Sequence, residues 1–141
     1  MKLVICGSMN FSKEMVELKE RLSSLGFDNV ILPHNAEKYA SNELNPETNH
    51  ESARNKIERD LVRKYYREIE EADAVIIANY DKAGIKNYIG GNAFLEAAFA
   101  HVLNKDLYFL FSIPEMSYTD ELKALQPVIL DDDLSKIIKK Y

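Results

Sequence analysis

Cysteine is nearly absent from this chain of 141 residues, which contains one, Cys6, and no tryptophan. A single cysteine has no partner within the chain, so no disulfide framework can form, and a reducing compartment is expected. Cys6 ends the apolar run of residues 3–6, where we expect it to be a small buried core residue.

Long apolar runs and an excess of positive charge are also missing. No stretch approaches the roughly 20 apolar residues that a membrane-spanning helix needs, and residues 1–6 are too short for a signal sequence. Asp and Glu number 23 against 18 Lys and Arg, whereas nucleic-acid binding requires a concentrated positive surface. We therefore expect a cytoplasmic protein with no membrane and no nucleic-acid partner.

The sequence shows no internal repeat, linker or low-complexity tract, and its length suits one domain. Short apolar runs predict strands at residues 3–6, 30–32, 74–78, 107–111 and 128–130. The connections are long enough for crossovers, which favours a parallel sheet with helices on both faces. We predict one α/β domain over residues 1–141, a flavodoxin-like or Rossmann-like three-layer sandwich with five parallel strands in the order 2-1-3-4-5.

Helical spacing of apolar residues predicts the intervening helices. They are expected at residues 12–25 with Ser12 as N-cap, at about 51–72 and at about 92–103, with a final helix after the acidic run 131–133. A helical turn is expected near residues 120–125. Residues 33–50 are polar and without period, which predicts the longest loop, and long loops in compact domains are usually functional.

Strand order also predicts where a ligand would bind. In such sheets ligands bind at the carboxyl ends of the strands, beside the switch point between strands one and three. Glycines there permit a close backbone approach, polar groups can hold a phosphate or a sugar hydroxyl, and a tyrosine can stack on a base. Equally, Ser8 or Asn10 can simply cap the first helix, and the glycine pair can simply form a turn. The candidate binding residues are Gly7, Ser8, Asn10, Asn79, Asp81, Tyr88, Gly90, Gly91 and Asn92.

Glu96 is the main candidate for chemistry. The segment 93–103 around it is apolar on nearly every side, so we expect a largely buried helix. A carboxylate there costs several kcal/mol unless it is hydrogen-bonded or faces a polar cavity. With Asn92 as N-cap, Glu96 would also lie near the positive end of the helix dipole. No Lys or Arg stands at 99 or 100 to form a helical ion pair, so we favour a functional role.

Other titratable residues give weaker signals. His34, His50 and His101 match no metal-ligand spacing, and we expect neither a metal nor an organic cofactor. Asp73 precedes the third strand, at the amino edge of the sheet, so we interpret it as a structural turn residue.

Several of these features occur together in one known family. The first strand ends in Cys-Gly-Ser at 6–8, residues 71–76 read Glu-Ala-Asp-Ala-Val-Ile, and a glycine-rich loop leads to Glu96. Ala100 and Asn104-Lys105 then follow at intervals of four before the strand at 107–111. Across residues 2–112 this order resembles the nucleoside 2-deoxyribosyltransferase superfamily, including the deoxynucleoside 5′-monophosphate N-glycosidases. The resemblance implies a flavodoxin-like fold and a homo-oligomer that is a dimer or an assembly of dimers.

The resemblance further implies that Glu96 is a nucleophile that attacks C1′ of deoxyribose and releases the base. Where the family has an aspartate this chain has Tyr65, and where it has a tyrosine on the first strand this chain has Val4. Its glycine-rich loop also differs from the family's compact form. The implied function is a nucleoside or nucleotide N-glycosidase or 2-deoxyribosyltransferase-like enzyme.

Two alternatives stay open. One is a non-catalytic nucleotide-binding or sensing module of the same fold. The other is a scaffold in which an interface between copies of the chain buries the helix at 93–103.

Overall fold

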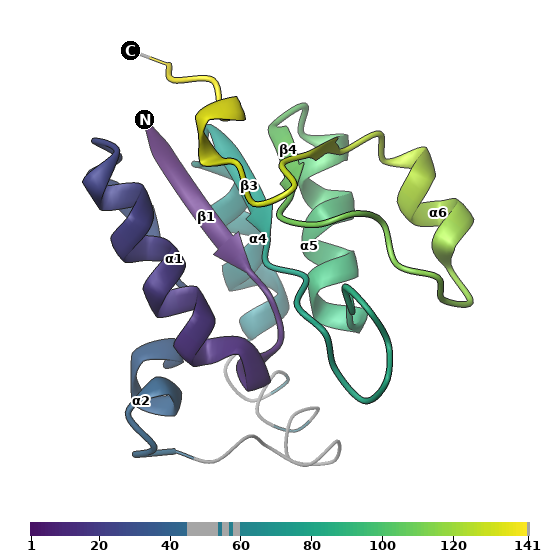
Figure 1. Ribbon diagram of the computed structural model, residues 1–141, viewed down its shortest axis with the longest axis horizontal. Helices are drawn as coiled ribbons and strands as arrows, with labels where there is room; N and C mark the ends of the chain where they lie inside the picture. The colour runs from purple at the N-terminus through teal and green to yellow at the C-terminus, as the bar shows by residue number, and fades with distance from the viewer. Residues whose placement is uncertain (45–53, 55–56, 58–59, 141) are drawn as a thin grey trace.

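The computed structural model describes residues 1–44, 54, 57 and 60–140 (Figure 1). The fold is α/β, with one five-stranded, all-parallel sheet in the order β2-β1-β3-β4-β5, which confirms the predicted architecture and strand order. The strands are β1 (Lys2–Cys6), β2 (Asn29–Ile31), β3 (Ala74–Ile77), β4 (Asp106–Phe109) and β5 (Val128–Ile129). The helices are α1 (Ser12–Ser24), α2 (Ala36–Ala40), α4 (Leu61–Glu70), α5 (Gly91–Val102) and α6 (Thr119–Ala124), with 3-10 turns η1 (Met9–Phe11) and η2 (Leu134–Lys136).

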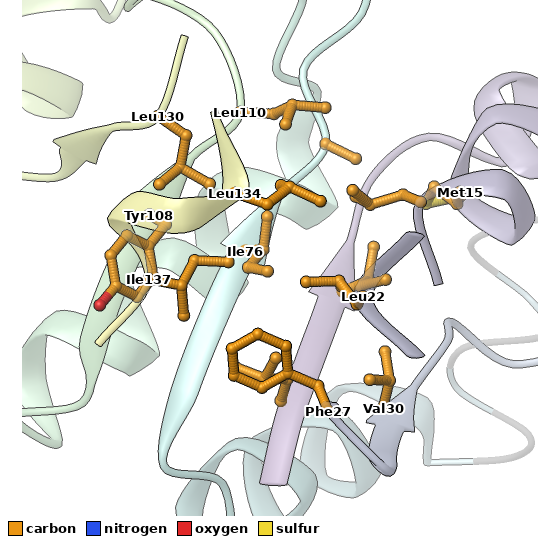
Figure 2. Packing of buried hydrophobic residues seen from close by; sticks show 14 of the residues in the cluster. Met15, Leu22, Phe27, Val30, Ile76, Tyr108, Leu110, Leu130, Leu134 and Ile137 are labelled. Carbon is orange, nitrogen blue, oxygen red and sulfur yellow. The ribbon is translucent and has the colours of Figure 1, made fainter. Parts of the chain in front are cut away.

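Alternating side chains of the central strands supply two cores, one on each face of the sheet. Leu3 and Ile5 of β1 contribute to the core beneath α1, whereas Val4 and Cys6 contribute to the core beneath α4 and α5. Figure 2 shows the first core, in which Ile76 of β3 lies among side chains from α1, β4 and the C-terminal segment. Because both faces are covered, residues 3–6 of β1 and 74–77 of β3 are all apolar, as is usual in parallel sheets.

Several helix boundaries differ from the prediction. Ser12 is the first residue of α1 rather than its N-cap, since Ser8 caps the preceding turn η1 instead. A continuous helix over 51–72 is wrong, because Asp60 has a φ of 50° in the left-handed region and α4 starts after it. Most of residues 45–59 lie outside the described part of the chain. The predicted final helix is only the 3-10 turn η2, with Asp133 as its N-cap.

The helix at 93–103 is less buried than its composition predicts. Three alanines of α5 (Ala93, Ala97, Ala100) face the sheet, whereas Leu95 is 47% and Val102 73% exposed. Isolated apolar side chains are ordinary on protein surfaces, so they do not decide whether copies of this chain associate. A homo-oligomer therefore stays a prediction. Among the described residues, no helix has both the length and the apolar character to cross a membrane.

Asn79 joins the ends of two neighbouring strands. Its side chain is fully buried beyond β3, where Nδ2 donates to the carbonyls of Phe111 (2.9 Å) and Ser112 (3.1 Å). Its Oδ1 accepts from the Phe111 amide at 2.9 Å. Both amide protons are used, so this side chain orders the loops that follow β3 and β4.

We predict that Asn79→Ala lowers the free energy of unfolding by about 2–4 kcal/mol, because it leaves buried backbone groups without partners. Urea denaturation followed by circular dichroism measures the change. The exposed Asn29, replaced by Ala, is the matched control and should shift stability by no more than about 0.5 kcal/mol. Equal effects of the two substitutions would contradict the assigned role.

Candidate functional site

A cavity of about 140 Å³ opens beside the carboxyl ends of β1 and β2, on the face covered by α4 and α5. Its apolar side comes from the two strands and the residues just after β2, and its polar side comes from α4, α5 and the loop after β2. The apolar lining residues are Val4, Ile5, Ile31, Leu32 and Pro33, and the polar ones are His34, Lys64, Tyr65, Glu68 and Glu96. An apolar wall with a few converging polar groups is the usual composition of a small-ligand site.

Glu96 lines this cavity from the second turn of α5. The helix starts at Gly91 with Gly90 as N-cap, not Asn92, so Glu96 lies beyond the first turn. The helix dipole acts mainly within that turn, and it therefore stabilises the carboxylate less than the sequence indicated. At the start of α5, Tyr118 donates a hydrogen bond to the Ile89 carbonyl and stacks on Phe94 with 4.9 Å between ring centroids.

Cys6 is a partner of Glu96. Its thiol is fully buried at the end of β1 and forms a hydrogen bond with the Glu96 carboxylate. Burial raises the pKa of the Cys6 thiol well above its ordinary value, and the negative charge of Glu96 raises it further. The thiol therefore stays protonated at neutral pH and acts as a hydrogen-bond donor to the candidate nucleophile.

Glu68 contributes a second carboxylate to the cavity. It pairs with the Lys2 ammonium group at 2.8 Å, on side chains that are 33% and 17% exposed, respectively. The hydrogen bond to Glu68 is the main cause of a raised pKa for Lys2. Lys2 also binds the amino edge of β3, because its backbone amide donates to the Asp73 carboxylate at 2.6 Å. Asp73 thus has the structural role that its position predicts.

Of the candidate site residues, only Glu96 lines the cavity. Asn79 is committed to the loop contacts described above, and the exposed Asp81 accepts from the Asn87 amide at 2.9 Å. At Gly7, an added Cβ would lie 3.0 Å from the Met15 sulfur, so packing against α1 accounts for this glycine. These three positions have structural explanations.

The two glycines before α5 differ from each other. A Cβ at Gly90 would lie 3.1 Å from the Tyr88 hydroxyl, so a side chain there would require the tyrosine ring to shift by a few tenths of an ångström. At Gly91 an added Cβ would meet nothing within 4 Å, and its φ is not in the left-handed region. The chain's own packing therefore gives no reason for Gly91. Asn92 follows it, exposed in the first turn of α5.

The remaining candidates form a separate cluster at the same edge of the sheet. Ser8 accepts from the backbone amide of Asn10 (3.3 Å), from its side-chain amide (3.1 Å) and from the Lys82 ammonium group (3.3 Å). The same ammonium group lies 4.9 Å from the centroid of the Tyr88 ring. Tyr88 in turn approaches Gly90, which links the cluster to the start of α5.

Sequence reasoning missed the polar groups that α4 contributes. In the sequence, Lys64 and Glu68 are two of many charged residues in the helix predicted at 51–72, and Tyr65 stands out only in the family comparison. Their spacing places them on one side of the helix, and packing of α4 against α5 turns that side toward Glu96. Among the residues that the structure describes, no group of three or more His, Cys, Asp or Glu side chains is placed to hold a metal ion.

We predict that Cys6 in the native protein reacts with a thiol reagent such as DTNB about a hundredfold or more slower than in guanidinium-unfolded protein. Burial blocks access, and the raised pKa suppresses the reactive thiolate. Absorbance of the released chromophore measures the rate, and Cys6→Ser, which has no thiol, provides the blank. Comparable rates in the folded and unfolded states would show that Cys6 is not buried beside Glu96.

The chain matches no protein-family model, and no curated protein matches it in sequence. The resemblance to the nucleoside 2-deoxyribosyltransferase superfamily therefore depends on a few short motifs, at residues 6–8, 71–76 and 90–105. The features that bear on function are the cavity and the cluster of Ser8, Asn10, Lys82 and Tyr88, which we call the Ser8 cluster.

Proposed function

We propose that this protein is a nucleoside or nucleotide N-glycosidase, or a related 2-deoxyribosyltransferase-like enzyme, with Glu96 as its nucleophile. One observation supports this more than any other. Glu96, which the chain shares with the family, and Val4 and Tyr65, which replace two of the family's site residues, come from α5, β1 and α4, yet all three line one cavity. These residues are far apart along the chain, so their convergence in space is an argument for a common site that the sequence order alone does not supply.

The size of the cavity agrees with a sugar-centred reaction. Its volume of about 140 Å³ is below the roughly 300–1,000 Å³ of typical small-molecule sites, so it can enclose only part of a nucleotide. We place the sugar beside Glu96, with the base and any phosphate extending toward the loops that end the strands. The apolar wall from Val4 and Ile31 would exclude water from the sugar face next to the carboxylate.

A carboxylate next to a sugar can act as a covalent catalyst. One Glu96 oxygen would form a bond to C1′ as the bond from C1′ to the base nitrogen breaks, and the electron pair leaves with the base. The base takes up a proton, and water or a second base then attacks C1′ and releases Glu96. The Cys6 hydrogen bond stabilises the ionised carboxylate that this attack requires.

We predict that Glu96→Gln abolishes release of free base from deoxynucleosides or their monophosphates, by about a thousandfold or more, because an amide is a poor nucleophile. Liquid chromatography of the base released from a substrate panel measures the activity. Glu70→Gln, an exposed glutamate on α4, is the matched control and should retain full activity. If the wild type releases no base, or Glu96→Gln releases as much as the wild type, the proposal is wrong.

A second candidate function is a nucleotide-binding or sensing module without turnover. Tyr65 supports it, because this side chain lines the cavity at the place where the family has an aspartate. A phenol is a much weaker acid than a carboxylic acid, so protonation of the leaving base would be slower. The cavity and the Ser8 cluster would then serve recognition alone.

For such a module we predict that a nucleotide at about 100 times its Kd raises Tm by about 5–10 °C while no base is released. A thermal-shift assay with parallel chromatography separates binding from turnover. Stabilisation accompanied by base release would favour the enzyme. No stabilisation by any nucleotide would contradict both candidates.

A further inference from the structure

One face of β1 carries a partner for each of the two carboxylates that line the cavity. Lys2, Val4 and Cys6 share this face, because side chains two residues apart on a strand point the same way. Lys2 binds Glu68 of α4 at 2.8 Å, and Cys6 forms a hydrogen bond with Glu96 of α5. Val4, between them, lines the cavity. The Cα atoms of the two partners are about 13 Å apart along the strand, so β1 sets the spacing of the two carboxylates.

The packing of α5 brings Glu96 to Cys6 independently of that hydrogen bond. Ala93 and Ala97, which precede Glu96 by three residues and follow it by one, are buried in the same core as Cys6. Glu96 also shares the cavity wall with Val4, two residues before Cys6 on the same face of β1. Small side chains let a helix approach the sheet closely. The fold therefore places this carboxylate beside the end of β1.

The backbone at Cys6 is fixed on both sides. Cys6 pairs with Ile77 of β3, and its carbonyl accepts from the Ala78 amide at 2.8 Å. At the next residue, Gly7, an added Cβ would lie 3.0 Å from the Met15 sulfur, so the chain is tightly packed there. One torsion places a cysteine sulfur, whereas a glutamate carboxylate has several torsions to fix and loses more entropy. The thiol is therefore a rigid donor for a flexible carboxylate.

Cys6 supplies a donor without adding a charge. Burial raises the pKa of its thiol, which therefore stays protonated at neutral pH. All other titratable groups around the cavity are left in place when Cys6 is replaced, so the effect of a substitution isolates the hydrogen bond. These groups are Lys64, Tyr65 and Glu68 from α4 and His34 from the loop after β2, and on α5 itself His101 is exposed.

We propose that Cys6 is a positioning residue, whose thiol holds the Glu96 carboxylate beside the cavity, a role that Cys6→Ser keeps and Cys6→Ala loses. This inference rests on the proposed function, because the position of Glu96 matters most if Glu96 is the nucleophile. A displacement of about 1 Å can slow a reaction about a hundredfold. Without the donor the carboxylate loses its fixed position and also keeps a proton to higher pH.

The single thiol of this chain gives a direct probe of the contact. Its S–H stretching band falls in a region of the Raman spectrum where other protein groups give no band, and Cys6 is its only source. A hydrogen bond to a charged acceptor lowers the wavenumber of this band. We expect Glu96→Gln to move the band to higher wavenumber, and Glu70→Gln, an exposed change on α4, to leave it in place. An unchanged band in Glu96→Gln would overturn the inference.

The role of the thiol is tested by base release in full-length Cys6→Ala, Cys6→Ser and Ile77→Val. We expect Cys6→Ala to lower kcat about tenfold or more, to change KM less than about twofold, and to move the acid limb of the pH–rate profile to higher pH. Cys6→Ser keeps a donor and should retain kcat within about threefold. Ile77→Val removes one methylene from the same core, opposite Cys6, and should behave like the wild type.

Three kinetic results would also overturn the positioning role. They are a wild-type kcat with an unmoved acid limb in Cys6→Ala, an equal loss in Cys6→Ser and Cys6→Ala, and an equal loss in Ile77→Val, which would make packing the cause. Circular dichroism and Tm of each variant identify a folding defect. If Cys6→Ala does not fold, the Raman measurement still decides, since it changes Glu96 and leaves the core intact.

The two kinds of measurement separate this inference from the proposed function. If the wild type releases no base, the proposed enzyme is wrong, and a Raman band that responds to Glu96→Gln still supports Cys6 as the residue that positions Glu96. Base release that depends on Glu96 but is unaffected by Cys6→Ala supports the enzyme and rejects the positioning role.

Discussion

The parallel pairing of β1 with β3 is the interaction on which the rest of the structure depends. The register runs from Leu3 opposite Ala74 to Cys6 opposite Ile77, and the Ala78 amide extends it by donating to the Cys6 carbonyl at 2.8 Å. This pairing puts the carboxyl ends of β1 and β3 side by side, near the middle of the sheet's carboxyl edge. The first loop and the loop after β3 therefore meet there, which is how Ser8 and Lys82 come into contact.

Burial on both faces is what makes that edge suitable for a site. Because β1 alternates between two cores, Cys6 must face the helices α4 and α5, where its thiol contacts Glu96. The carboxylate is thus held by a buried donor on one side and opens to a cavity on the other. An ordered partner helps to fix the position of a half-buried charge, and a fixed position is what a nucleophile or a binding group requires.

The cavity and the Ser8 cluster use different chemistry at neighbouring places. The cavity combines an apolar wall with two carboxylates, a lysine, a histidine and a tyrosine, which is the usual composition of a small-ligand site. The Ser8 cluster combines hydroxyl, amide and ammonium donors, which suits an anion.

The sequence by itself determined the fold, because apolar runs of strand length alternating with helical periods leave few topologies for a chain of this size. It also singled out Glu96, since a carboxylate in an apolar helix requires hydrogen bonds or a polar cavity to offset the cost of burial. Helix ends were less well determined, because capping at Gly90 and the left-handed Asp60 are local conformations that apolar periodicity does not report.

Only the tertiary structure decided which polar side chains share a site. Lys64, Tyr65 and Glu68 look like one charged face of a helix until α4 packs against α5, and Lys82 looks like a loop lysine until strand pairing brings it to Ser8. Such contacts join residues far apart in the chain, and pattern along a sequence carries no information on distances across it.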